Sequence, residues 1–139
     1  MSESAPEVVA SIYFDSWLDE SPELRAEMSA DDRHLIYEAK GVILDLLIRP
    51  LPDRAASHIS GQVLIESSEM EESFDEVSHR AVFLDAPQHS YSTNTNELGE
   101  FVCSLVPEAT WDLTVELRDR RFVVRGVSNA ERRDWRSSC

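Results

Sequence analysis

Histidines and cysteines are the residues of this chain whose chemistry is easiest to recognise from spacing. The four histidines are His34, His58, His79 and His89. No two of them have the spacing of a zinc finger or of a metalloprotease helix. Neither of the two cysteines has a second cysteine three positions away. We therefore expect the histidines to be ordinary surface or core residues, and we expect no metal site.

Carboxylates are the next candidates, because paired acids can transfer protons or bind cations. The adjacent pairs Asp31-Asp32 and Glu71-Glu72 lack the glycine and spacing of a calcium loop. We expect both pairs on a solvated face. Paired carboxylates for glycoside hydrolysis would need a cleft, which a sequence does not reveal.

Nucleophiles and phosphate loops are not indicated either. The chain has no Gly-x-Ser-x-Gly elbow, and its four glycines form no phosphate-binding loop. A catalytic triad assembled from distant residues is the least favoured hypothesis. We expect a protein that is not an enzyme and that carries no cofactor.

The charge of the chain favours one class of partner. Thirteen basic and 27 acidic residues give a formal net charge of -14. Such a surface repels nucleic acid and anionic membranes, because affinity for phosphates depends on Lys and Arg. It would attract a basic protein by electrostatic steering. We expect a basic protein partner and no direct binding to nucleic acid or to a membrane.

The ends of the sequence and its cysteines suggest a compartment. Acidic residues begin the chain where a signal peptide needs a basic region, and no apolar run has the length of a membrane span. Cys103 alternates with apolar residues and is expected in the core, whereas Cys139 is expected at the surface. We expect a cytoplasmic protein that needs no disulfide.

The elements that position these residues are predicted by alternation with a period of two. The clearest case is 110–117, where Trp111, Leu113, Val115 and Leu117 share one face. Further strands are expected over 8–14, 35–39, 42–48, 59–66, 81–84, 91–95, 101–105 and 122–124. Turns are expected at Lys40-Gly41 and at 96–99. The outward positions read mainly as Thr, Asp, Glu and Ser.

These runs predict one all-β domain over 1–127, a seven- to eight-stranded antiparallel Greek-key sandwich. At most one short helix is expected, at 21–28, with Ser21 as its N-cap and Pro22 in its first turn. The polar tail 128–139 is expected to be loose. A sandwich of this size has edge strands that can pair, so a dimer remains an open alternative.

Four segments resemble one family over roughly residues 57 to 127. A Gly-x-Val strand lies in Ile59–Leu64, a Val-x-Leu strand in Ala81–Leu84, a polar turn in Thr93–Phe101, and a Leu-x-Pro segment in Leu105–Val115. This order resembles carboxypeptidase-regulatory-like, or transthyretin-like, β-sandwich domains. Glu108-Ala109 replaces the usual glycine after the proline, so that turn must differ. The resemblance implies a non-catalytic accessory domain.

A second resemblance covers the whole chain and rests on Val8–Ser16 and Arg33–Ala39. These segments look like small bacterial proteins that occur beside extracytoplasmic-function sigma factors and caspase-like CHAT proteases, sometimes in type III CRISPR loci. The resemblance implies a regulatory partner in such a signalling or antiviral defence system. A sigma factor or an associated regulatory protein would then be the partner.

The partner-binding residues suggested by the sequence are aromatic side chains outside the core and one acidic loop. In the loop at 66–76, Met70 and Phe74 are apolar anchors within an acidic run, beside Glu71, Glu72 and Asp75. The other candidates are Trp17 and Trp135. The loop is also compatible with a disordered segment kept soluble by charge, and Trp17 with packing on the end of the sandwich.

The sequence therefore leaves two functions open. The first is a non-enzymatic regulatory adaptor that binds a protein through its acidic surface and one exposed edge or loop. The alternative is a carbohydrate- or small-ligand-binding sandwich. The polar outward positions weaken the alternative, because sugar-binding sandwiches usually present exposed aromatic rings.

Overall fold

The structure is a computed structural model, and it describes residues 6–16, 32–51, 56–66, 75–106, 110–118 and 120–128. The strands in these residues are β1 (Glu7–Val9), β2 (Ser11–Asp15), β3 (Arg33–Ala39), β4 (Val42–Leu51), β5 (Ala56–Ile65), β6 (Ala81–Asp85), β7 (Ser90–Asn94), β8 (Glu100–Val106), β9 (Thr110–Glu116) and β10 (Arg121–Ser128). One helical turn occupies 75–77. No helix within the described residues is both long and apolar enough to cross a membrane.

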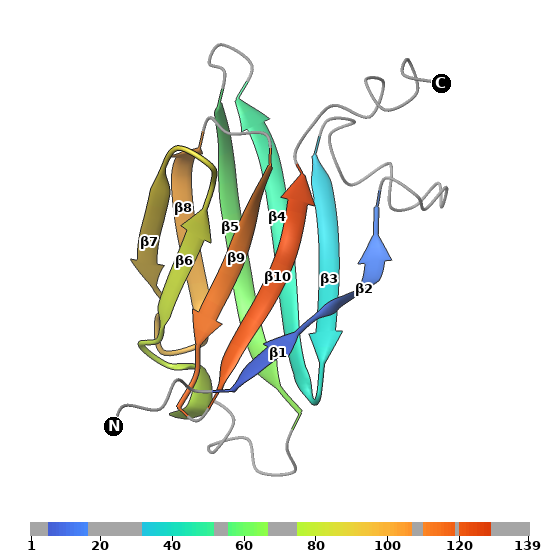
Figure 1. Cartoon of the computed structure of the whole chain (residues 1–139), viewed down its shortest axis with the longest axis vertical. Helices are drawn as coiled ribbons and strands as arrows, with labels where there is room; N and C mark the ends of the chain where they lie inside the picture. Colours follow the sequence, from blue (N-terminus) through green and yellow to red (C-terminus); the bar gives the residue numbers. More distant parts are fainter. Residues whose placement is uncertain are drawn as a thin grey trace.

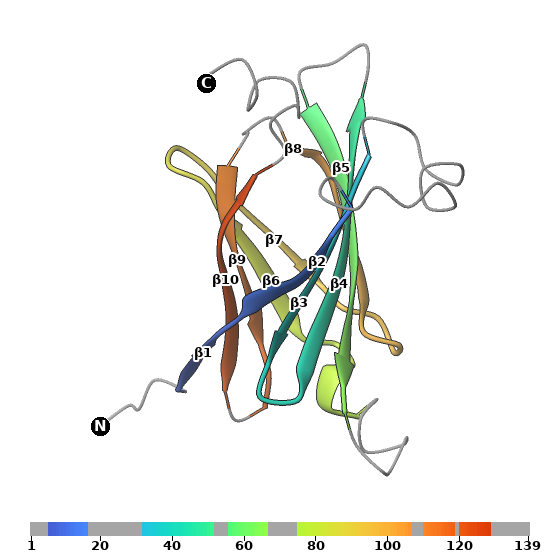
Figure 2. The same cartoon turned by 90° about the vertical axis from the view of Figure 1, so that its right-hand side faces the viewer.

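The strands form two five-stranded sheets that face each other. Sheet A has the order β1-β10-β9-β6-β7, and sheet B has the order β2-β3-β4-β5-β8. Sheet A lies in front of sheet B in Figure 1, and Figure 2 shows the two layers from the side. The predicted all-β class is confirmed.

The N-terminal run differs from its prediction. One strand is expected over 8–14, but the chain leaves the edge of sheet A at Ala10 and continues at the edge of sheet B. Because β3 and β10 run in opposite directions (Figure 1), one continuous run is antiparallel to β3 and parallel to β10. This division is one reason why the described chain has ten strands rather than seven or eight.

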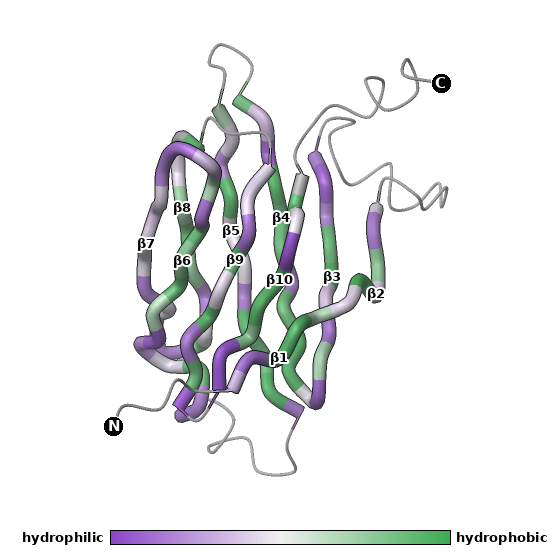
Figure 3. Tube along the Cα trace, viewed as in Figure 1, coloured by the Kyte–Doolittle hydropathy of each residue, from purple (hydrophilic) through white to green (hydrophobic). Residues whose placement is uncertain are grey.

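The core lies between the sheets and is built by the predicted alternation. Trp111, Phe101 and Cys103 are buried, as the sequence predicts, and Cys103 is a free thiol. The largest fully buried side chains are Trp111, Phe122, Leu35, Leu44, Leu46, Ile48, Ile59, Leu84, Leu113, Val42, Val63 and Val77. Hydrophobic segments run within the strands, and the turn joining β6 to β7 is hydrophilic (Figure 3).

Both predicted turns form. Lys40 and Gly41 have positive φ values of 49° and 82°, as the central pair of a two-residue hairpin requires. At the second turn, Gly99 has a φ of 83° and its N–H donates to the Asn96 carbonyl at 3.1 Å. This turn joins β7 of sheet A to β8 of sheet B, so it connects the two layers.

A bulge interrupts the alternation in β8. Ile59 pairs with Cys103, but Ser57 pairs with Val106, so β8 contains one extra residue between these pairs. Val106 is therefore buried, although strict alternation from Phe101 and Cys103 assigns that position outward.

The predicted helix at 21–28 lies outside the described residues, as does the tail beyond Ser128. Strand β10 ends at Ser128, one residue after the predicted end of the domain.

Candidate functional site

The outer face of sheet B carries a row of polar side chains across three strands. Asp45 of β4 pairs with Gln62 of β5, and Gln62 pairs with Glu100 of β8. Burial alternates along β4 and β5, which places the neighbours of these residues in the core and these side chains outside. We call Asp45, Gln62 and Glu100 the polar row.

Apolar side chains flank the polar row on both sides. Leu47 and Val102 lie two residues away on one side, and Ile43 and Leu64 pair with each other on the other side. Val102 is 51% exposed and Leu64 is 37% exposed. This face is therefore more apolar than the predicted Thr, Asp, Glu and Ser, because Ile43, Leu47, Leu64 and Val102 also occupy outward positions.

The turn before β8 fixes the position of Glu100. The Asn96 side-chain amide donates to Glu100 Oε1 at 2.9 Å, while Asn96 Oδ1 accepts from the backbone N–H groups of Leu98 and Glu100, both at 2.9 Å. Gln62 Nε2 donates to the Leu98 carbonyl at 3.1 Å. The carboxylate of Glu100 thus stands at the end of a hydrogen-bonded network and is oriented before any partner binds.

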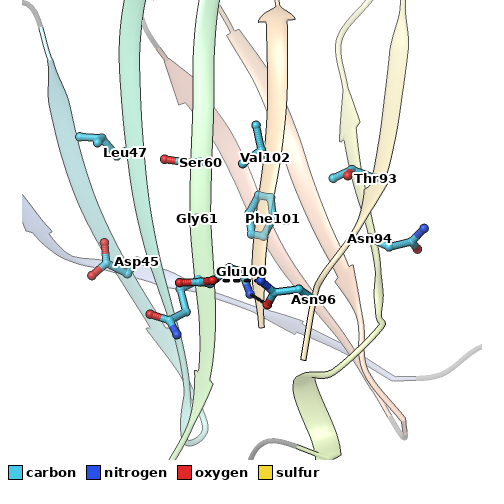
Figure 4. Close-up of a pocket in the computed structure, with 11 residues that line it drawn as sticks. Asp45, Leu47, Ser60, Gly61, Thr93, Asn94, Asn96, Glu100, Phe101 and Val102 are labelled. Atoms are coloured by element: carbon cyan, nitrogen blue, oxygen red, sulfur yellow. Dashed lines mark hydrogen bonds between the residues drawn. The ribbon is translucent and has the colours of Figure 1, made fainter. Parts of the chain in front are cut away.

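A groove of about 600 Å³ opens along the polar row and continues from β8 to β7 (Figure 4). Its polar lining residues are Asp45, Ser60, Gln62, Thr93, Asn94, Asn96 and Glu100. The remaining lining residues are Leu47, Gly61, Phe101 and Val102, so no Lys or Arg is among the described residues of the lining. The groove presents carboxylate and amide oxygens above an apolar floor.

Close packing beneath the groove explains a glycine in it. Gly61 pairs with Phe101, and a Cβ atom at Gly61 would lie 2.5 Å from the Phe101 Cζ atom. The Phe101 ring therefore occupies the space of the missing side chain. This contact holds β5 and β8 together at the point where the polar row crosses them.

A histidine extends the charged part of this face towards β3. His34 Nε2 lies 2.6 Å from Asp45 Oδ1, and the His34 ring packs edge-on against Phe14 at 5.5 Å between centroids. Ser16 Oγ accepts from the backbone N–H of His34 at 2.8 Å. Within the described residues no serine hydroxyl bonds to the His34 ring, so the pair lacks the nucleophile of a hydrolytic triad.

One predicted solvated acid is instead structural. Asp32 is only 7% exposed, and its Oδ2 accepts from Arg49 Nε at 3.3 Å. The prediction of a solvated face is wrong for Asp32, because β4 brings a guanidinium to it. The remaining acids of the two predicted pairs, Asp31 and Glu71-Glu72, lie outside the described residues.

Six of the seven predicted partner-binding residues lie outside the described residues. These are Trp17, Met70, Glu71, Glu72, Phe74 and Trp135. Asp75 is described: it is exposed, it begins the helical turn, and its backbone carbonyl accepts from Arg80 Nη2 at 3.2 Å. Asp75 is not among the residues that line the groove. The partner-binding residues predicted from the sequence therefore do not indicate the groove.

A second exposed surface lies at the sheet edges formed by the N-terminal run. Val9, Ile12 and Tyr13 are exposed there, Tyr13 to 77%. Tyr13 is the unpaired residue of a bulge between the Ile12–Tyr37 and Phe14–Ile36 pairs. This edge is apolar, whereas the groove combines apolar and acidic groups.

The described residues contain no group of three or more His, Cys, Asp or Glu side chains arranged to hold a metal ion. No family model, curated protein or solved structure matches this chain. Fixed carboxylate and amide oxygens between apolar groups suit a ligand that carries both a cation and apolar side chains.

Proposed function

We propose that this protein is a non-enzymatic adaptor that binds a basic segment of another protein on the outer face of sheet B. The observation that carries the proposal is the polar row, flanked by apolar side chains, in a groove whose described lining residues include no Lys or Arg. A Lys or Arg side chain would meet Asp45 and Glu100, and apolar neighbours would cover Leu47, Val102 or Leu64.

Charge on two scales supports a basic partner. The net charge of -14 attracts such a partner over a distance, and the polar row supplies the acceptors for short-range contacts. The same charge disfavours nucleic acid and anionic membranes as direct ligands. The resemblance to small bacterial proteins encoded beside sigma factors and CHAT proteases makes a cytoplasmic sigma factor or associated regulator the first partner to test.

The finer classification belongs to the same proposal. We assign the sandwich to the transthyretin-like Greek-key class of carboxypeptidase-regulatory-like domains. Its support is the placement of the segments that resemble the family. Val63 of the Gly-x-Val strand and Trp111 with Leu113 of the Leu-x-Pro segment point into one core, from β5 and β9.

The alternative, a carbohydrate- or small-ligand-binding module, is favoured by one feature. Gln62, Asn94 and Asn96 give the groove amide groups of the kind that bind hydroxyls. However, among the described lining residues only Phe101 is aromatic, and it is 3% exposed, so these residues present no ring face to a sugar.

The test uses two variants that each remove two negative charges. The face variant combines Asp45→Asn with Glu100→Gln. The control variant combines Asp85→Asn with Glu116→Gln, two exposed acids of sheet A. Each tagged protein is used to capture partners from lysate of the native host at about 0.05 M and about 1 M salt, with quantitative mass spectrometry, because high salt screens surface charges.

We expect one basic protein to be retained by the wild type and by the control variant at low salt. It should be released at high salt and lost from the face variant, in capture and then in titration of the purified partner. Retention by the face variant equal to that of the control would contradict the proposal. Binding of polysaccharide instead, with no basic protein retained, would favour the alternative.

A further inference from the structure

Strand β8 is an edge strand whose second side opens into the groove. In sheet B it is the last strand, and it pairs with β5 alone. Its outward side chains in the groove lining are Glu100 and Val102. Across the groove lie Thr93 and Asn94 of β7, the edge strand of sheet A.

The hydrogen-bond pattern shows which backbone groups of β8 face that open side. The Val63 N–H donates to the Gly99 carbonyl at 2.9 Å, so the carbonyl of Gly99 points towards β5, while its N–H bonds to the Asn96 carbonyl within the turn. In an antiparallel ladder this direction alternates, and Phe101 then faces β5 while Glu100 and Val102 face away from it. Glu100 confirms the alternation, since its N–H and C=O both bond to Asn96, outside the ladder.

Val102 is therefore the first residue of β8 that offers both backbone groups to an added strand. Glu100 is already satisfied by the turn, which ends the available edge on that side. Edges of natural sheets are usually protected by lysine, proline or inward-facing charges. Between Glu100 and Val106, β8 contains none of these, and its bulge, another feature that can protect an edge, lies between Cys103 and Val106, beyond Val102.

We propose that the basic partner adds an extended segment to the free edge of β8, within the groove. The segment pairs with Val102 through its main chain, places an apolar side chain beside Val102, and places a Lys or Arg beside Glu100. Cross-strand neighbours of this kind stabilise a sheet when apolar residues or opposite charges are paired. This inference rests on the proposed function and specifies how the partner binds.

A second copy of the chain fits this edge less well. Two copies would bring together two molecules that each carry a charge of -14, which opposes their association. A basic segment reduces that charge, and strand addition gives it main-chain affinity together with side-chain selectivity.

The probe is a capped heptapeptide in which lysine, valine and lysine occupy the second, fourth and sixth positions and threonine the rest. Its lysines and valine share one face, and the order is the same read in either direction. When the valine pairs with Val102, the valine and lysine amides face β8 and the threonine amides face away. Binding is followed by amide chemical shifts of the full-length protein and by the dissociation constant.

We expect the peptide to shift the amide signals of Val102 and Ser104. Methylating the nitrogens of its valine and lysines should abolish binding, whereas methylating the threonine nitrogens on either side of the valine should preserve it. This comparison leaves the protein unchanged, so it does not depend on the folding of a variant.

The complementary test removes a main-chain hydrogen-bond donor from the protein instead of from the peptide. Val102→Pro removes the outward N–H, and proline is tolerated on edge strands where the N–H faces solvent. We expect about tenfold weaker binding, the effect of losing one main-chain hydrogen bond. The matched control is Ser92→Pro on β7, where the Thr95 N–H bond to the Arg80 carbonyl implies an outward N–H for Ser92, and we expect unchanged binding.

Equal binding of the two methylated peptides, or of both proline variants, would overturn strand addition. The proposed function would survive that result if the captured basic partner still required Asp45 and Glu100. Loss of salt-sensitive binding to every basic partner would instead refute the proposed function. If the wild type sediments as a dimer and Val102→Pro sediments as a monomer, the occupant of the β8 edge is a second copy of the chain. That result would overturn the choice of a basic segment.

Discussion

The close contact between Gly61 and the Phe101 ring can be tested by adding a methyl group at position 61. In Gly61→Ala, the added methyl group would meet the Phe101 ring at 2.5 Å and the Asp45 carbonyl at 3.1 Å. We expect a loss of about 1–3 kcal/mol in the free energy of unfolding, the usual effect of overpacking. The measurement is urea unfolding. In a Phe101→Leu background the same substitution should cost less, and strictly additive effects would contradict this contact.

Two buried groups predict a loss of stability at alkaline pH. Burial raises the pKa of the Cys103 thiol above 9.0, and burial, opposed by Arg33, raises the pKa of Tyr37 above 10.0. The unfolded chain therefore releases these protons first, so stability is unaffected near neutral pH and falls as pH rises past these values.

The Tyr37→Phe variant isolates one of the two groups. Its unfolding free energy, measured against pH, should fall less steeply than that of the wild type above pH 10.0 and should be parallel to it below pH 9.0. Parallel curves over the whole range would show that Tyr37 does not contribute.

Two glycines with positive φ, one in the turn before β8 and one in β10 of sheet A, separate the effect of backbone conformation on stability from the effect of crowding. Gly99 (φ 83°) ends the turn that fixes Glu100, and a Cβ there would lie 2.5 Å from the Val63 carbonyl oxygen. Gly126 (φ 67°), in the bulge of β10, would place a Cβ in open space.

Substitution by alanine should therefore affect the two sites differently. Gly126→Ala should cost about 1–2 kcal/mol, the penalty of a left-handed conformation alone. Gly99→Ala should cost more, because it adds a clash with backbone. Chemical unfolding of both variants measures the difference, and equal losses would mean that the turn before β8 adjusts freely.

The elements were predictable where one face of a strand is buried and the other is wet. Residues 110–117 and 42–48 follow this rule, and the structure confirms their inward side chains. Alternation fails at the bulges in β8 and β10, where an extra residue changes the face without any change in composition. Alternation also gives no sign that the chain passes from sheet A to sheet B at Ala10, because both halves of the run 8–14 are β-prone.

The groove could not be predicted from the sequence, for a related reason. Asp45, Gln62 and Glu100 lie far apart along the chain, and only the register of β4, β5 and β8 brings them into one row. The outward Leu47 and Val102 gave a signal, since apolar residues recur on both faces of these strands. The hydrogen bonds of Asn96 to Glu100 depend on turn geometry that spacing alone does not determine.

Across the whole molecule, acidic side chains have two different roles. Within the described chain, several acids are paired with arginines in structural contacts, including Asp15 with Arg33 and Glu7 with Arg121. Asp45 is different: it contacts His34 rather than an arginine, the described residues of the groove that it faces include no Arg or Lys, and its side chain is 45% exposed. Acids held by arginines stabilise the sandwich, whereas we propose that Asp45 is available to a partner.

Amide hydrogen exchange of the protein alone and in complex with the basic partner that it captures tests whether the groove of sheet B is the binding site. We expect slower exchange on binding in β8 and at the outward-facing positions of β4 and β5, with little change in β6, β9 and β10 of sheet A. Protection confined to sheet A, or to the exposed N-terminal edge at Val9–Tyr13, would contradict the assignment of the groove as the binding site.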